Sequence, residues 1–190
     1  MPHSLNKPLY NLGNLPSETR RPLLKGLRGN YQTVDLIKKI AHKRKSHPMI
    51  RKLAENIIKE YRTNSQDFMN EAYAIGDWVK LNLPYAKDPK GVESLKDPLT
   101  MIDQLQRGEM YGDCDDMSLL IATLLLSIGH QPYLCIVRYK GVKRGFQHIY
   151  VCTYEKNHHQ KRERLVLDAI VKDRHTGWEV DHILKKEIKV

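Results

Sequence analysis

Three side chains in the second half of the sequence have the types and the order needed for thiol chemistry. Cys114 stands in GDCDD, His148 in FQHIYV and Asp168 in LVLDA. A cysteine nucleophile needs a base, and that base needs a partner that orients it. We therefore predict that Cys114 is the nucleophile, that His148 is the general base and later the general acid, and that Asp168 fixes the imidazole tautomer.

The segment that contains Cys114 is predicted to be a central helix. Apolar residues cover nearly every face of residues 112–129, a pattern typical of a helix buried on all sides. Gly112 permits a tight entry turn, and Gly129 ends the helix. Three carboxylates are expected to cap its first turn: Asp113, Asp115 and Asp116. The helix dipole favours a thiolate and the carboxylates oppose one, so we expect the carboxylates to point into caps, away from the sulfur.

Each of the three residues also has a plain structural interpretation. Cys114 can be a buried core thiol, His148 a satisfied core histidine, and Asp168 a residue that bonds to a turn at a strand end. A zinc site made from the same three residues is a weaker alternative, because they lack the short spacing of metal motifs. We expect no metal and no cofactor.

These motifs resemble the transglutaminase-like superfamily of papain-like thiol enzymes. The resemblance is carried by GDCDD with its leucine-rich helix, by FQHIYV and by LVLDA, and it spans residues 31–170. The upstream segment WVKLNLPYAKDPKGVESLKDP resembles small members encoded by phages and prophages. The superfamily includes peptidases, amidases, transglutaminases and members without reported activity, so the resemblance implies acyl transfer through Cys114, His148 and Asp168.

The periodicity predicts an α+β fold in which helices precede a small antiparallel sheet. Helices are expected from Thr33 as a cap to residue 43, from Pro48 to about residue 61, over residues 66–81, and over residues 98–106 after an Asp97 cap. Strands are expected over residues 133–139, 146–154 and 164–170. The central helix would lie across this sheet, as in a papain-like or transglutaminase core.

We divide the chain into an extended arm (1–30) and a single transglutaminase-like domain (31–190). The domain comprises a basic helical part (31–62), a catalytic core (63–170) and a C-terminal extension (171–190). The last of these ends in an apolar pattern too short to assign.

An acyl-transfer site also needs hydrogen-bond donors for the oxyanion. The backbone N–H of Cys114 is one candidate, since it lies at the helix start. In related enzymes a second donor comes from an upstream side chain, and the residues that could supply it here are Tyr85, Gln104 and Gln106. The other two cysteines, Cys135 and Cys152, lie in predicted strands and are expected to be core residues.

The net charge of +10 comes from one third of the chain. Residues 20–62 contain 13 lysines and arginines against 3 acidic residues, and the rest is balanced. This segment is either a solvated helical face or a docking surface for an acidic partner, such as a phage structural protein. Nucleic acid is less favoured, because no aromatic platform or glycine-rich phosphate loop accompanies the charge.

The sequence therefore favours a thiol-dependent peptidase or amidase that acts on a peptide or isopeptide bond of a protein or peptide substrate. The alternative is a phage virion or assembly protein that uses the same fold for docking. No apolar run is long enough to span a membrane, no secretory leader is visible, and three cysteines do not suggest a disulfide framework. We expect a cytoplasmic location, in the host cell if the chain is phage-encoded, or else a place in the virion.

Overall fold

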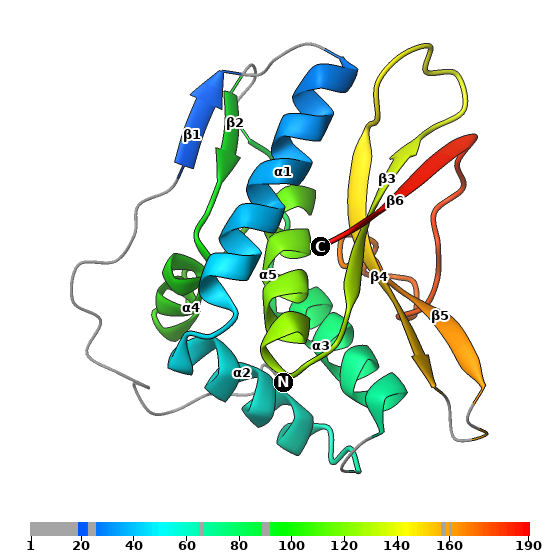
Figure 1. Cartoon of the computed structure of the whole chain (residues 1–190). Helices are drawn as coiled ribbons and strands as arrows, with labels where there is room; N and C mark the ends of the chain where they lie inside the picture. The colour runs from blue at the N-terminus through cyan, green and yellow to red at the C-terminus, as the bar shows by residue number, and fades with distance from the viewer. Residues whose placement is uncertain (1–18, 23–25, 65–66, 89–91, 157–158, 160) are drawn as a thin grey trace.

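The computed structural model describes residues 19–22, 26–64, 67–88, 92–156, 159 and 161–190. Its helices are α1 (Leu27–Arg44), α2 (Pro48–Glu60), α3 (Phe68–Asn82), α4 (Pro98–Gln106) and α5 (Cys114–Ser127). Its strands are β1 (Thr19–Pro22), β2 (Val92–Leu95), β3 (Pro132–Arg138), β4 (His148–Lys156), β5 (Arg162–Leu167) and β6 (Leu184–Lys189). The helices gather on one side of the β3–β6 sheet, so the predicted α+β class is confirmed (Figure 1).

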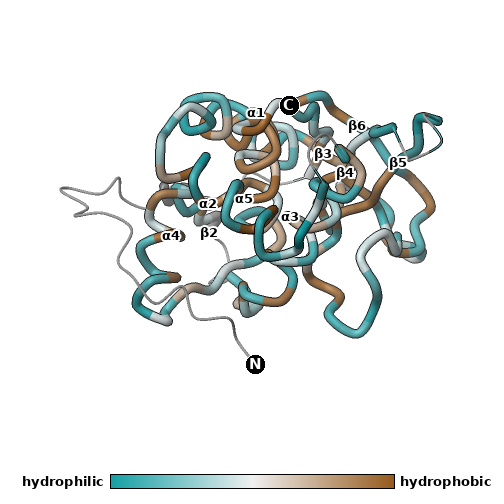
Figure 2. The backbone as a smooth tube through the Cα atoms, turned by 90° about the horizontal axis from the view of Figure 1, so that it is seen from below, coloured by the Kyte–Doolittle hydropathy of each residue, from teal (hydrophilic) through white to brown (hydrophobic). Residues whose placement is uncertain are grey.

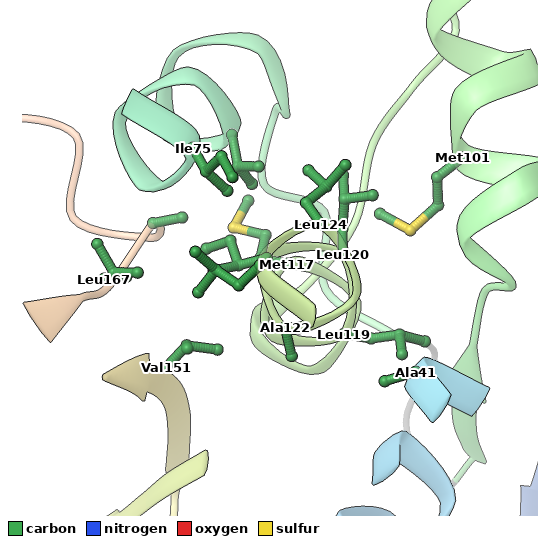
Figure 3. Close-up of a cluster of buried hydrophobic side chains, with 14 of the residues drawn as sticks. Ala41, Ile75, Met101, Met117, Leu119, Leu120, Ala122, Leu124, Val151 and Leu167 are labelled. Atoms are coloured by element: carbon green, nitrogen blue, oxygen red, sulfur yellow. The ribbon is translucent and has the colours of Figure 1, made fainter. Parts of the chain in front are cut away.

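Helix α5 lies at the centre of the molecule, as its apolar sequence predicted. Leu119, Leu120 and Leu124 are fully buried. Figure 3 looks along the helix and shows its neighbours on every side, with Val151 and Leu167 from the sheet, Ile75 from α3, Met101 from α4 and Ala41 from α1. A helix that contacts partners all round has no polar face to keep in water, which explains the unbroken apolar run.

The main sheet is antiparallel, with strand order β5-β4-β3-β6. One face packs on α5 through residues such as Leu134 and Val151, whereas the alternate residues Cys135 and Cys152 form a second apolar cluster on the other face. The three predicted strands are present within three residues of their expected bounds. The fourth, β6, adds an edge beside β3 in the segment that could not be assigned from sequence.

The start of the helical part differs from the prediction. Helix α1 begins at Leu27, so residues 27–30 are helical and Thr33 is a buried residue inside the helix, not its cap. Gly26 occupies the cap position with φ 68°, a backbone angle that glycine adopts at little cost. Residues 19–22 of the expected arm form β1 and pair with β2. The remainder of the arm, residues 1–18 and 23–25, lies outside the described residues.

The positively charged segment is exposed on α1, α2 and the turn after them. Exposed basic residues there are Arg28, Lys39, Lys43, Arg51, Lys59 and Arg62. Hydrophilic stretches of the backbone lie mainly at the periphery (Figure 2). Arg44 is an exception, because it is partly buried and pairs with the Asp97 cap of α4 at 2.8 Å. None of the described helices has the length and apolarity needed to cross a bilayer.

A close approach of α3 to β5 explains a glycine inside α3. A Cβ atom at Gly76 would come within 2.5 Å of Leu167 Cδ2. Leu167 is the last residue of β5 and directly precedes Asp168. Gly76 therefore lets α3 support the strand end that bears Asp168.

A buried histidine links the end of α5 to the sheet and to α3. His130 Nδ1 lies 2.8 Å from Glu155 Oε1, and its Nε2 lies 3.1 Å from Glu71 Oε2. Burial alone would lower the pKa of His130, but the hydrogen bonds and charges of Glu155 and Glu71 outweigh it and raise that pKa. The folded state therefore favours the charged imidazolium.

This arrangement predicts a pH dependence of stability. The contribution of His130 should be fully present below the unfolded pKa, about 6.5, and should be lost as the pH rises through the higher folded pKa. We expect His130→Gln to lower the melting temperature by several degrees at pH 5.5. This gap in melting temperature between the parent protein and the variant should narrow by pH 8.5. The exposed His42→Gln is the control. A gap that widens with pH would contradict this assignment.

Candidate active site

Cys114 is the first residue of α5, and its position is fixed by the turn before it. The Asp113 carboxylate caps the helix by accepting from the N–H groups of Asp115 (3.0 Å) and Asp116 (3.3 Å). A Cβ atom at Gly112 would lie 2.7 Å from Asp116 Cβ, so the tight entry requires glycine. The turn therefore places Cys114 at a helix N-terminus, as predicted.

His148 and Asp168 form a buried pair. His148 is the first residue of β4, and Asp168 follows the last residue of β5. His148 Nε2 lies 2.8 Å from Asp168 Oδ2, with the two side chains 3% and 1% exposed. The other carboxylate oxygen of Asp168 accepts from the Ile170 N–H at 3.3 Å. An ionised Asp168 requires a proton on Nε2, which leaves Nδ1 as the nitrogen able to take up a proton.

Cys114 and His148 line one cavity of about 470 Å³. Its walls come from three places: the start of α1, the N-terminus of α5, and residues 144–149 with Ile136. Ser118 of α5 donates to the Ile149 carbonyl at 3.3 Å, which ties the cysteine helix to the strand of His148. The structure thus brings the three predicted residues to one region, with Asp168 behind the imidazole.

The surroundings of the thiol differ from the expectation that all three carboxylates point away from the sulfur. The Cys114 Sγ lies 3.5 Å from Asp115 Oδ1, and the described residues show no hydrogen bond between Cys114 and His148. Burial, followed by the charges of Asp115 and Asp113, raises the pKa of Cys114, and the Ile149 N–H offsets only part of this rise. The resting side chain is therefore a neutral thiol, since the thiolate is disfavoured.

The expected role of the three carboxylates is correct for Asp113 alone. Asp115 accepts from the thiol, while Asp116 is 1% exposed and accepts from the Lys96 N–H at 2.8 Å. Burial is the main cause that raises the pKa of Asp116 to about 7. Asp116 is thus a tertiary link that holds the start of α4 against α5. Its position in the first turn indicated a cap, but its contact with Lys96 depends on a loop 20 residues upstream.

Removing the charge of Asp115 should activate the thiol. In Asp115→Asn the pKa of Cys114 should fall, so more thiolate should be present at a given pH. We expect the rate of Cys114 alkylation by iodoacetamide at pH 7 to rise roughly 3- to 10-fold. Asp103→Asn, on α4, is the matched control. A slower reaction in Asp115→Asn would instead make Asp115 the base that deprotonates the sulfur.

The oxyanion candidates are one backbone N–H, that of Cys114, and three side chains, and they differ in how they lie relative to the thiol. The carboxylate of Asp113 takes the N–H groups of Asp115 and Asp116, and the Cys114 N–H has no acceptor among the described residues. Tyr85 forms a bridge to Gly112, and the Cys114 charge is the second cause, after burial, that raises the pKa of Tyr85. Gln104 and Gln106, on α4, are not among the residues that line the cavity. Tyr85 is not among those residues either, but its bridge to Gly112 ties it to the turn before Cys114, so it remains the better placed of the three side chains.

The zinc alternative does not fit this geometry. Among the described residues, no group of side chains close enough to share a metal ion contains Cys114, His148 and Asp168 together. Since Nε2 of His148 is bonded to Asp168, these two residues pair with each other and do not converge on a common point with the sulfur.

Two residues at the site were missed by the sequence analysis. Asn30 lies in the expected arm, yet its Nδ2 donates to the Phe146 carbonyl and its Oδ1 accepts from the Phe146 N–H, both at 3.1 Å. This pair of bonds holds α1 beside the strand of His148. Tyr139 stacks on the His148 ring, with centroids 6.3 Å apart. No local pattern indicates either role, because both contacts join distant parts of the chain.

Comparisons with known proteins give similar folds at low identity. A putative protease from Parabacteroides distasonis ATCC 8503 has 12% identity and a TM-score of 0.44, with 72% of this chain and 26% of that chain covered. A putative cysteine protease from Cytophaga hutchinsonii has 18% identity and a TM-score of 0.44, with 77% and 42% covered. LapG of Legionella pneumophila has 17% identity and a TM-score of 0.42, with 89% and 78% covered.

The chain therefore spans less than half the length of the first two proteins. No family model and no curated protein matches the sequence. Functional arguments for this chain rest on its own residues.

Proposed function

We propose that this protein is a thiol-dependent acyl-transfer enzyme, a peptidase or amidase that cleaves a peptide or isopeptide bond. The single observation that carries the proposal is the shared cavity: Cys114 at a helix N-terminus and His148, backed by a buried 2.8 Å bond to Asp168, line the same space. A nucleophile, a base and an orienting carboxylate in one place are the parts that amide cleavage requires.

In the proposed reaction the Cys114 sulfur attacks the carbonyl carbon of the substrate while His148 Nδ1 takes the thiol proton. The sulfur first turns from Asp115 toward the imidazole, a change that binding of substrate in the cavity drives. The Cys114 N–H stabilises the oxyanion, and the imidazolium protonates the leaving amine. Water, deprotonated by His148, then releases the acyl group and regenerates the thiol.

Asp168 contributes by orientation and charge. Its bond to Nε2 holds the proton on that nitrogen, keeps Nδ1 ready to accept the thiol proton, and stabilises the imidazolium that forms. The neutral resting thiol fits this scheme, because proton transfer to His148 then accompanies attack and need not precede it.

The first test needs no knowledge of the substrate. The rate of Cys114 alkylation by iodoacetamide is measured from pH 5.5 to 10, with the adduct located by mass spectrometry. A thiol with a raised pKa reacts slowly at neutral pH unless a base assists it, so we expect a His148-dependent rate below pH 8. In His148→Ala this component should fall at least about tenfold, leaving one titration at high pH.

Hydrolysis of fluorescein-labelled casein provides the second readout. We expect Cys114→Ser to abolish it and Cys152→Ser to retain it. If Cys114 shows the same pH profile in the parent and in His148→Ala, and casein is not cleaved, the chain is not a thiol enzyme of this kind. That result would favour the docking alternative, a virion or assembly protein whose exposed basic residues on α1 and α2 bind an acidic partner.

A further inference from the structure

Two cysteines lie together on the sheet face that points away from α5. Cys135 is on β3 and Cys152 on β4, and both are fully buried. The register pairs Cys135 with Tyr150 and Tyr133 with Cys152, so the two cysteines occupy diagonal positions on the same face of neighbouring strands. They form part of the second apolar cluster and play no part in the proposed acyl transfer.

The two sulfur atoms are in direct contact. Cys135 Sγ lies 3.0 Å from Cys152 Sγ and donates its proton to it. A cation lies beside the pair, since Arg164 Nη2 is 3.6 Å from Cys135 Sγ. The hydrogen bond from Cys135, aided by the Arg164 charge, lowers the pKa of Cys152 although burial opposes this change. An apolar core alone would instead keep both thiols neutral and inert.

A metal ion does not suit this cluster. Ligand atoms of Cys135, Cys152 and Glu187 do lie within 4.8 Å of one another. However, the Arg164 guanidinium bonds to Glu187 Oε1 at 2.8 Å through Nε and reaches Cys135 through Nη2. A permanent cation already occupies the place where a metal ion would bind.

We propose that Cys135 and Cys152 are a reversible disulfide-forming site that is oxidised by hydrogen peroxide. The Cys152 thiolate attacks one peroxide oxygen and becomes a sulfenic acid, and the other oxygen leaves as water once protonated. The Cys135 thiol then attacks the sulfenic sulfur, the S–S bond forms, and a second water leaves. In total two thiols and one peroxide give one disulfide and two waters.

The surroundings permit this reaction. The sulfurs need to approach by only about 1 Å to reach a disulfide bond length. Arg164, which contacts Cys135, is 21% exposed; it pairs with Glu179, which also pairs with Lys185, and these two are 25% and 27% exposed. Tyr133 and Tyr154 pack against the same cluster. Lys185 belongs to β6, an edge strand, and edge strands open locally more readily than central ones.

The experiment uses the full chain with Cys114→Ser, which leaves only the two thiols in question. The reduced protein is treated with hydrogen peroxide at pH 7.5. It is then denatured in the presence of N-ethylmaleimide, which labels any free thiol. We expect the intact mass to fall by two hydrogen atoms, both thiols to become unreactive to maleimide, and dithiothreitol to restore them. The crosslink should join the peptides of Cys135 and Cys152. The melting temperature should rise on the order of 5 °C, because the bond closes a loop within the sheet.

A variant with both Cys114→Ser and Cys152→Ser is the control and should form no intramolecular bond. The proposal is overturned if both thiols still react with maleimide after a peroxide dose that fully oxidises a free cysteine peptide in the same tube. It is also overturned if the protein gains oxygen atoms without a crosslink. Because Cys114 is absent, neither result bears on the proposed acyl transfer.

Discussion

Replacing Asp168 with asparagine should reduce casein hydrolysis by about 10⁴-fold while the protein stays folded. This magnitude is the one seen when the buried aspartate of a serine-protease triad is changed to asparagine. The physical reason is the proton on His148. An asparagine amide can donate to Nε2, which moves the imidazole proton to Nδ1 and removes the acceptor for the Cys114 thiol.

The geometry of the pair makes this substitution informative. Both side chains are almost fully buried, so water cannot replace the lost carboxylate oxygen. Asparagine has nearly the same shape, and the Ile170 N–H can still bond to an amide oxygen. The control is Asp173→Asn, an exposed residue five positions downstream that is not among the cavity-lining residues. Retention of the parent rate in Asp168→Asn would refute the assigned role of Asp168.

The largest expected effect on stability is at the centre of α5. Leu120→Ala should lower the free energy of unfolding by about 2–5 kcal/mol, because Leu120 is fully buried and α5 has neighbours on every side that cannot all close the gap (Figure 3). Urea denaturation measures the change. Leu81→Ala, on α3, is the matched control: Leu81 is 67% exposed, so its loss should cost less than about 0.5 kcal/mol. Equal losses in the two variants would show that α5 is not the centre of the core.

The sequence predicted α5 and most of the sheet because their signals are local. The apolar run of α5, its aspartate cap and its glycine stop all lie within residues 112–129. Likewise, Asp97 followed by Pro98 fixed the start of α4. Such elements are specified by neighbours in the chain, so their existence and approximate bounds can be read directly from residue order.

The differences arose where distant residues decide the structure. Helix α1 begins at Leu27 without a side-chain cap, and its first turns are held by bonds from Asn30 to Phe146. Strand β6 is largely polar and gains its place from pairing with β3. The orientation of Asp115 toward the Cys114 thiol is a side-chain choice within one helical turn, which residue spacing does not determine.

The bonds between Asn30 and Phe146 join residues 116 positions apart, and this separation governs when the cavity can form. During synthesis, Cys114 and the rest of α5 are made before residues 144–149 and Asp168. Of these later residues, 144–149 form one wall of the cavity. That wall closes only after the ends of a long loop have met, and the conformational entropy lost in closing the loop makes this step slow. The cavity therefore assembles only after α1, α5 and residues 144–149 are all available, so the Cys114 sulfur exists in the nascent chain before the imidazole of the proposed base, His148.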